Sequence, residues 1–196
     1  MAGPAAGNMA DVEIFILALT EILSRKRETL VDQWFSQAVA TYPDESARFL
    51  KRKKDQFHNP VGHTLALETD ALFTELLGDM DQQKIQASLD RIVRIRAIQD
   101  FCPSLALGFI ASLKAIIWRE LGDQIRQQGL AEEMRGLEGR LDQVLLMAFD
   151  VFMAVRQRIY EMKAEEVKRL YYQVIRKADI LCPIPQQEEP DLPSGK

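Results

Sequence analysis

The stretch LAEEMRGLEGRLDQVLLMAFDVFMAVRQRIYEM, residues 130–162, decides the fold class. Its apolar residues return every three or four positions, which is the spacing that places side chains on one face of an α-helix. The residues of this repeat are Leu137, Leu141, Val144, Ala148, Val151, Val155, Ile159 and Met162. The spacing predicts the longest helix of the protein, running from about residue 130 to residue 178.

Helical spacing also extends upstream over most of the chain. A first helical region is expected over residues 10–39, and Asn59 followed by Pro60 is typical of a helix start. Asp81 is expected to begin a helix that runs to Asp100, and Pro103 to begin the next. Alternating apolar and polar runs typical of strands are absent. We therefore expect an all-α bundle of about six helices with a long C-terminal helix, with a globin-like helical fold as the alternative.

The length and composition suit one domain with short appendages. The chain has 196 residues, 47% of them hydrophobic, which is enough to bury a full core. We expect a flexible lead over residues 1–9, a single helical domain over 10–181, and a disordered tail over 182–196, where prolines and acidic residues dominate.

Charge and cysteine usage exclude several classes of protein. The net charge of −4 argues against general binding of nucleic acid, which needs a basic excess. Cys102 and Cys182 lie far apart and encode no disulfide framework, so a reducing cytoplasm is expected. Neither a secretory signal nor an apolar run of about 20 residues is visible, so we expect no transmembrane segment.

The sequence has no recognisable signature of catalysis or of cofactor binding. It lacks a GxSxG motif, a cysteine-protease signature and a glycine-rich loop after a strand. His58 and His63 are five residues apart across a helix start, a spacing that does not place both rings on one face. We therefore expect no enzyme, no metal and no cofactor, although a small ligand that touches His58 or His63 in a pocket of the bundle remains an alternative.

The best candidate for a binding or sensing face is the stretch RAIQDFCPS, residues 96–104. Arg96, Gln99 and Asp100 fall at i, i+3 and i+4 and would share one helix face among apolar neighbours. Such groups either pair within the bundle or wait for a ligand, because an unpaired buried charge costs several kcal/mol. Asn59 and His63, at the predicted helix start, complete this candidate face.

The second half of the long helix is a candidate docking surface. It is highly charged, while Val167, Leu170, Tyr171 and Val174 keep apolar side chains at helical spacing. A solvated amphipathic helix is the alternative. The residues proposed for partner docking are Arg156, Tyr160, Glu166, Lys168 and Arg169, and a homodimer through this helix is one form that docking could take.

Three stretches resemble the RsbRD amino-terminal sensory domain family: FHNPVGHTL (57–65), LDRIVRIRAIQDFCPS (89–104) and VRQRIYEMKAEEVKR (155–169). The resemblance implies an all-helical signal-input module, usually placed ahead of an output domain such as a STAS domain or a histidine kinase. No nucleic acid partner is implied; signals would pass by protein contacts. The positions that match the family pattern are Asn59, Gly62, Arg96, Gln99, Asp100 and Pro103.

Free-standing members of this length are similar to DsrT, the small T protein associated with dissimilatory sulfite reduction. That resemblance implies a cytoplasmic accessory protein, held at the inner face of the membrane by the DsrMKJOP electron-transfer complex. The alternatives are a stressosome-type module that binds STAS or kinase partners, and a small-ligand sensor.

Overall fold

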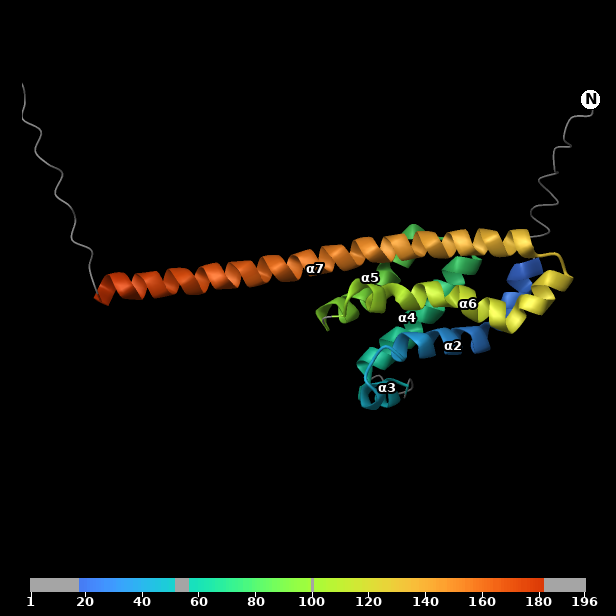
Figure 1. Ribbon diagram of the computed structural model, residues 1–196, viewed down its shortest axis with the longest axis horizontal. Coiled ribbons are helices and arrows are strands. Elements are labelled where there is room, and N and C mark those ends of the chain that lie inside the picture. Colours follow the sequence, from blue (N-terminus) through green and yellow to red (C-terminus); the bar gives the residue numbers. More distant parts are fainter. Residues whose placement is uncertain (1–17, 52–56, 100, 182–196) are drawn as a thin grey trace, which may run out of the picture. The chain divides into compact units, whose positions relative to one another are not determined.

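The structure is a computed structural model that describes residues 18–51, 57–99 and 101–181, with side chains described as far as residue 177. These residues form helices joined by turns, without a strand among them, which confirms the all-α prediction (Figure 1). Residues 18–25 are helical as well. The remaining helices are α2 (Arg27–Val39), α3 (Asp44–Leu50), α4 (Pro60–Leu77), α5 (Gln82–Ile98), α6 (Pro103–Gln127) and α7 (Ala131–Leu181).

The chain divides into two compact units between Arg156 and Gln157. The first contains α2 to α6 and the first half of α7, and the second contains the rest of α7. The predicted lead over 1–9 and the predicted tail over 182–196 lie outside the described residues, as does Asp100. Among the described helices, none combines the length and the apolar composition that crossing a bilayer requires.

The helix starts follow the local chemistry of the sequence. The Asn59 side chain accepts the Gly62 N–H at the start of α4, and Pro60 occupies the first helical position, where no donor is needed. At the start of α5, Asp81 Oδ1 accepts the N–H groups of Gln83 and Lys84, two residues of the first turn, at 2.9 and 3.3 Å. Both starts were predictable because each depends on neighbouring residues alone.

Two helix boundaries differ from the prediction. A turn at Lys26 separates the helical residues 18–25 from α2, so the first helical region is not continuous. Arg27 opens α2 and bonds to Asp70 and Thr74 of α4, so contact between the two helices takes precedence over the continuous apolar pattern. In addition, α5 ends at Ile98 rather than continuing to residue 100.

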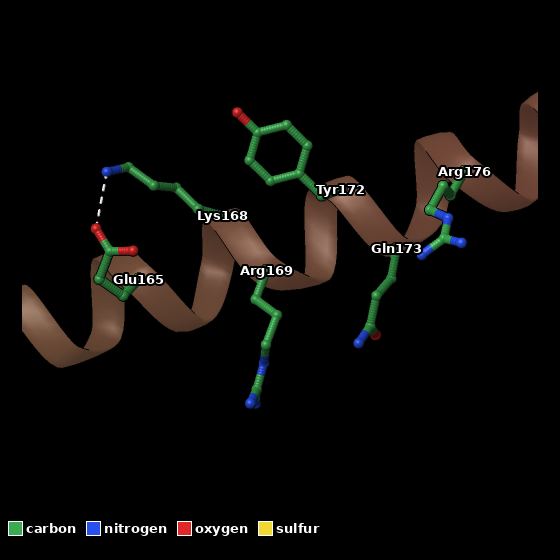
Figure 2. A pocket seen from close by; sticks show the side chains of 6 residues that line it. All are labelled: Glu165, Lys168, Arg169, Tyr172, Gln173 and Arg176. Atoms are coloured by element: carbon green, nitrogen blue, oxygen red, sulfur yellow. Dashed lines mark hydrogen bonds and ion pairs between the residues drawn. The ribbon is translucent and has the colours of Figure 1, made fainter.

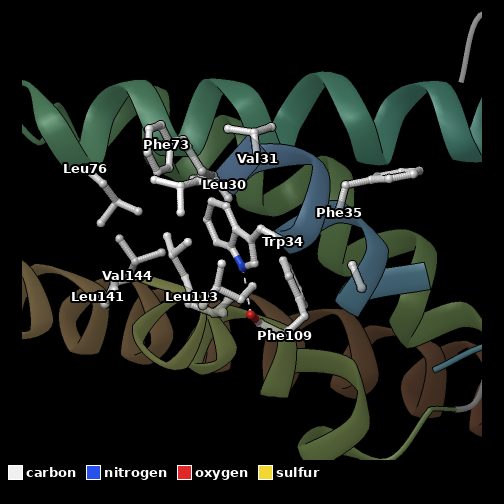
Figure 3. Packing of buried hydrophobic residues seen from close by; sticks show 14 of the residues in the cluster. Leu30, Val31, Trp34, Phe35, Phe73, Leu76, Phe109, Leu113, Leu141 and Val144 are labelled. Carbon is white, nitrogen blue, oxygen red and sulfur yellow. Dashed lines mark hydrogen bonds between the residues drawn. The ribbon is translucent and has the colours of Figure 1, made fainter. Parts of the chain in front are cut away.

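The core of the first unit forms around Trp34 of α2. Figure 3 shows its indole among apolar side chains of α2, α4, α6 and α7, including Phe73, Leu113 and Val144. The indole ring is fully buried, and its Nε1 donates to the Phe109 carbonyl at 2.7 Å. That bond satisfies the only polar group of the side chain, so the ring contributes apolar burial without an unpaired donor.

Polar side chains fix the first half of α7 to its neighbours. Arg140 Nη1 donates to the carbonyls of Leu76 and Gly78 at 2.9 and 2.8 Å and so closes the end of α4. Lys114 of α6 pairs with Asp142 at 2.6 Å. The end carbonyls of a helix need such partners because they have none within the helix.

We expect Gly62→Ala and Gly136→Ala to change stability in opposite directions. A Cβ at position 62 would lie 2.3 Å from the Leu50 carbonyl oxygen, whereas a Cβ at position 136 meets nothing within 4 Å. Gly62→Ala should lower the free energy of unfolding by about 1 to 3 kcal/mol. Gly136→Ala should raise it by about 0.5 to 1 kcal/mol, as alanine does within a helix. Urea unfolding of both variants measures the difference, and equal effects would contradict the close approach at Gly62.

Candidate functional site

The predicted binding residue Arg96 is buried at the end of α5, where its guanidinium joins three helices. Its Nη1 donates to the Ala38 carbonyl of α2 at 3.0 Å. Its Nη2 donates to Thr41 Oγ1 at 2.7 Å and to the Leu105 carbonyl of α6 at 2.8 Å. The Nε atom is buried and has no hydrogen-bond partner. The sequence left open whether Arg96 pairs within the bundle or binds a ligand. Both of its terminal nitrogens pair within the bundle.

Aromatic rings complete the surroundings of the Arg96 charge. The guanidinium carbon lies 4.8 Å from the centroid of the Phe101 ring and 5.4 Å from those of Tyr42 and Phe109. No carboxylate among the described residues pairs with Arg96, and burial lowers the pKa of its guanidinium. Among the described residues, carbonyl oxygens and ring faces therefore stabilise this cation.

Tyr42 connects the buried Arg96 to the surface. Its hydroxyl donates to Gln99 Oε1 at 2.8 Å, and its ring meets the edge of Phe101 at a centroid distance of 5.0 Å. Burial raises the pKa of Tyr42, and the nearby Arg96 charge acts against that rise. Tyr42 therefore contacts both the exposed Gln99 and the guanidinium that bonds to α2 and α6.

An open groove of about 420 Å³ lies beside Tyr42 and Gln99. It runs over α3 and the start of α4, so segments far apart in the sequence share it. Apolar and polar groups are mixed along its walls, which suits a small organic ligand or an apolar side chain of a partner. Its lining consists of Tyr42, Glu45, Ser46, Phe49, Leu50, Asn59, Pro60, Val61 and Gln99.

Asn59 builds the floor of this groove rather than standing free in it. Its Nδ2 donates to the carbonyls of Phe49 and Leu50 at the end of α3, at 3.0 and 3.1 Å. Its Oδ1 accepts the Gly62 N–H at 2.9 Å. One buried amide therefore satisfies the end of α3 and the start of α4, and glycine at position 62 leaves room for the contact.

The structure brings together some of the predicted site residues and separates others. Gln99 and Asn59 line the same groove, and Tyr42 joins Gln99 to Arg96. His63 is partly buried in the first turn of α4 and does not line the groove, and Asp100 lies outside the described residues. Sequence reasoning missed Tyr42, which carries no local signal because its partners are more than 50 residues away.

The predicted docking residues fall into both units. Arg156 belongs to the first unit, is partly buried and donates to the Ala97 carbonyl of α5 at 3.2 Å. Tyr160, with 58% of its surface exposed, and the exposed Glu166 and Arg169 belong to the second. Arg156 is thus a structural contact at the end of α5, whereas the others face outward along α7.

Figure 2 shows that the charged side chains of the second unit stand on the surface of one helix. Lys168 Nζ pairs with Glu165 Oε1 at 2.9 Å, and this carboxylate raises the pKa of Lys168. Tyr172 extends beside the pair, while Arg169 and Gln173 point to another side. The hollow between them, about 350 Å³, is open helix surface and not an enclosed site.

The described residues contain no group of three or more His, Cys, Asp or Glu side chains arranged to hold a metal ion. His58 and His63 both have partners in the structure. The residues that the structure does describe thus give no donor set on which to build metal chemistry.

Residues 28–167 match the family model described as the RsbT co-antagonist protein rsbRD N-terminal domain, over more than two-thirds of the chain. The chain belongs to this family. In this RsbRD N-terminal domain, the matched residues include Arg96 with the groups around it, the residues that line the groove, and part of the charged half of α7. Comparison with curated proteins and with solved structures gives no match.

We expect Arg96→Lys to destabilise this RsbRD N-terminal domain more than Arg96→Met. Lysine keeps a buried charge but cannot reach all three acceptors or stack against the rings. Arg96→Lys should therefore lower the free energy of unfolding by about 3 to 5 kcal/mol. Methionine removes the charge together with its bonds, which should cost about 1 to 3 kcal/mol. Chemical unfolding gives the order, with the exposed Arg94→Lys as the control. The reverse order would refute the view that a buried charge is held here.

Tyr42 should make stability fall at alkaline pH. Its pKa is higher in the folded state than the value of about 10 in an unfolded chain, so the folded state holds the proton more tightly. This contribution is complete below about pH 10 and is lost as pH rises through the folded pKa, a range in which arginine stays protonated. Unfolding free energies of the native chain and Tyr42→Phe from pH 8 to about 11 test this, with Tyr172→Phe as the control. A constant difference between native and Tyr42→Phe would contradict it.

Proposed function

We propose that this RsbRD N-terminal domain is a signal-input module that acts through protein contacts and carries out no chemistry of its own. The observation that supports the proposal is the exposed face of the second unit. There, large apolar side chains such as Val167 and Leu170 are more than half exposed on a highly charged helix. Monomeric proteins rarely leave such residues uncovered in a row, and helices of this kind bind other proteins.

The charge of this face favours a partner with acidic groups. Residues 157–177 contain six basic side chains and three acidic ones, although the whole chain has a net charge of −4. Glu166 and Arg169 are exposed and three residues apart on one side of the helix. Rim charges of this kind steer association and select among partners.

The input side of the module is the groove beside Tyr42 and Gln99. A ligand or partner side chain that bonds to the Gln99 amide would break the bond of that amide with the hydroxyl of Tyr42, whose ring lies against Arg96. Gln99 caps α5, and the nearby Ala97 carbonyl holds Arg156 of α7. If Tyr42, Gln99 and Arg96 adopt two arrangements, these arrangements would therefore differ in the contact of Arg156, the α7 residue that ends the first unit.

Two partner classes follow from the family relationships. Membership of a family named after a co-antagonist of RsbT supports a stressosome-type partner with a STAS or kinase domain. The resemblance to DsrT supports the membrane complex DsrMKJOP of dissimilatory sulfur metabolism. In both cases the domain would act in the cytoplasm by binding, with no cofactor.

The test is affinity capture of the tagged chain from native cells with gently solubilised membranes. The variant Glu166→Lys with Arg169→Glu reverses two exposed charges, and we expect it to recover at least about tenfold less partner. The matched control is Asp90→Arg with Arg94→Asp, which reverses an exposed pair on α5. Mass spectrometry of the eluates identifies the partner.

Capture of STAS or kinase proteins by the native chain and the control variant, but not by the charge-reversal variant, supports a stressosome-type role. Capture of electron-transfer subunits with the same pattern supports the sulfur-metabolism role. Recovery of the same proteins by all three chains, or of background proteins alone, would overturn docking through this face.

A further inference from the structure

Two exposed phenylalanines accompany a basic run where the chain passes from α3 to α4. Residues 48–54 read RFLKRKK and contain five basic side chains and no acidic one. Phe49 of this run is 46% exposed, and Phe57, which follows it, is 93% exposed. Among the described large apolar side chains, Phe57 has the largest exposed fraction. Apolar and basic groups are thus offered to solvent in one short part of the chain.

The Asn59 amide holds the described parts of this region together. Its Nδ2 donates to the carbonyls of Phe49 and Leu50 at the end of α3, at 3.0 and 3.1 Å. Phe57 precedes Asn59 by two residues, so the Cα atoms of these two residues lie within about 7 Å of each other. The end of α3 is therefore fixed beside the turn that carries Phe57. Residues 52–56 lie outside the described part of the chain. The exposed described residues, which we call the aromatic-basic surface, are Arg48, Phe49, Lys51 and Phe57.

Acidic residues border the basic run and reduce its net charge. Asp44 and Glu45 belong to the first turn of α3, where carboxylates complement the positive end of the helix dipole, and Asp55 follows the run in the sequence. Residues 44–58 carry five basic and three acidic side chains, a net charge of +2, while the rest of the chain carries −6. Arg48 and Lys51 lie at the end of α3, away from the acidic start. Positive charge is therefore concentrated near the two phenylalanines.

This combination fits the surface of a membrane that contains anionic lipids. Anionic headgroups attract clustered basic side chains, and aromatic side chains enter the boundary between headgroups and acyl chains. Phe57 stands on a turn before α4, and a fluid bilayer accepts a protruding ring without a preformed cavity. An acidic protein would attract the charges, but it would need a complementary cavity to bury this ring. The exposure of Phe57 therefore favours lipid over an acidic protein.

We infer that the aromatic-basic surface binds directly to a membrane surface that contains anionic lipids. The inference goes beyond the proposed function, because the contact needs no protein partner and uses no residue of the second unit. Phe49 also lines the groove beside Tyr42. Lipid would therefore contact one wall of the candidate input site.

Sedimentation of the full chain with lipid vesicles tests the inference. One set of vesicles consists of phosphatidylcholine, and the other contains phosphatidylcholine with about 30% phosphatidylglycerol, an anionic lipid. We expect at least about tenfold tighter binding to the anionic vesicles, and this preference should fall as salt is added, because salt screens exposed charges. Equal affinity for the two sets of vesicles would overturn the inference.

Two charge-reversal variants locate the contact. Arg48→Glu with Lys51→Glu should weaken binding to the anionic vesicles by at least about tenfold, because each basic side chain near the lipid adds to the attraction. The matched control is Arg126→Glu with Arg135→Glu, which changes the net charge equally at two exposed residues elsewhere in the first unit. Circular dichroism checks that both variants stay helical. Equal weakening by the two variants would indicate an effect of net charge alone and would refute this surface.

A polarity-sensitive dye tests whether position 57 enters the lipid. In a chain with Cys102→Ser and Cys182→Ser, the dye is attached to Phe57→Cys, or to Leu67→Cys as the control, which is an exposed position on α4. Anionic vesicles should shift the emission to shorter wavelength at position 57 and leave it unchanged at position 67. No shift at position 57, or the same shift at both positions, would contradict insertion.

Polyglutamate separates lipid from an acidic protein as the occupant. Binding of the chain to polyglutamate but not to anionic vesicles would overturn the assignment to lipid. The outcome is independent of the proposed function, because the purified chain and the vesicles include no protein partner. A chain that binds vesicles but captures no partner through Glu166 and Arg169 keeps this inference and removes the function, and the reverse result removes the inference alone.

Discussion

The first unit depends on one buried cation, Arg96, for which the described residues provide carbonyls, a hydroxyl and aromatic rings and no carboxylate. The Arg96 guanidinium takes a carbonyl from α2, a carbonyl from α6 and a hydroxyl from the turn after α2, and three rings enclose it. If any of these groups were removed, the buried Arg96 charge would lose a stabilising contact. The cluster therefore fixes the ends of α2, α5 and α6 relative to one another. The groove beside Tyr42 has its shape because this cluster and the Asn59 amide fix the ends of the helices around it.

Local signals were enough to predict most helix boundaries. Asn59 with Pro60, Asp81 and Pro103 each begin a helix for reasons contained within a few residues, and the prediction of α4 and α6 follows from them. The turn at Lys26 was not predictable, because it accompanies the contact of Arg27 with α4, more than 40 residues away. Apolar spacing reports which face of a helix is buried but not where tertiary contacts interrupt it.

The candidate site was predictable only in part, for the same reason. The sequence pointed to Arg96 and Gln99 as polar groups among apolar neighbours, and both belong to the cluster. It did not separate them, although one is fully buried and the other exposed, because α5 ends between them. Tyr42 could not be found, since its importance arises only when the turn after α2 meets the end of α5.

The placement of the aromatic residues separates the optical signals of the two units. Both tryptophans of the chain lie in the first unit, Trp34 within its core and Trp118 near the surface, where its indole donates to Glu138. Three of the four tyrosines lie in the second, at positions 160, 171 and 172. Indole emission therefore reports on the bundle alone, and phenol absorbance is dominated by the charged half of α7. Indole emission and phenol absorbance of one unlabelled sample therefore weight the two units differently.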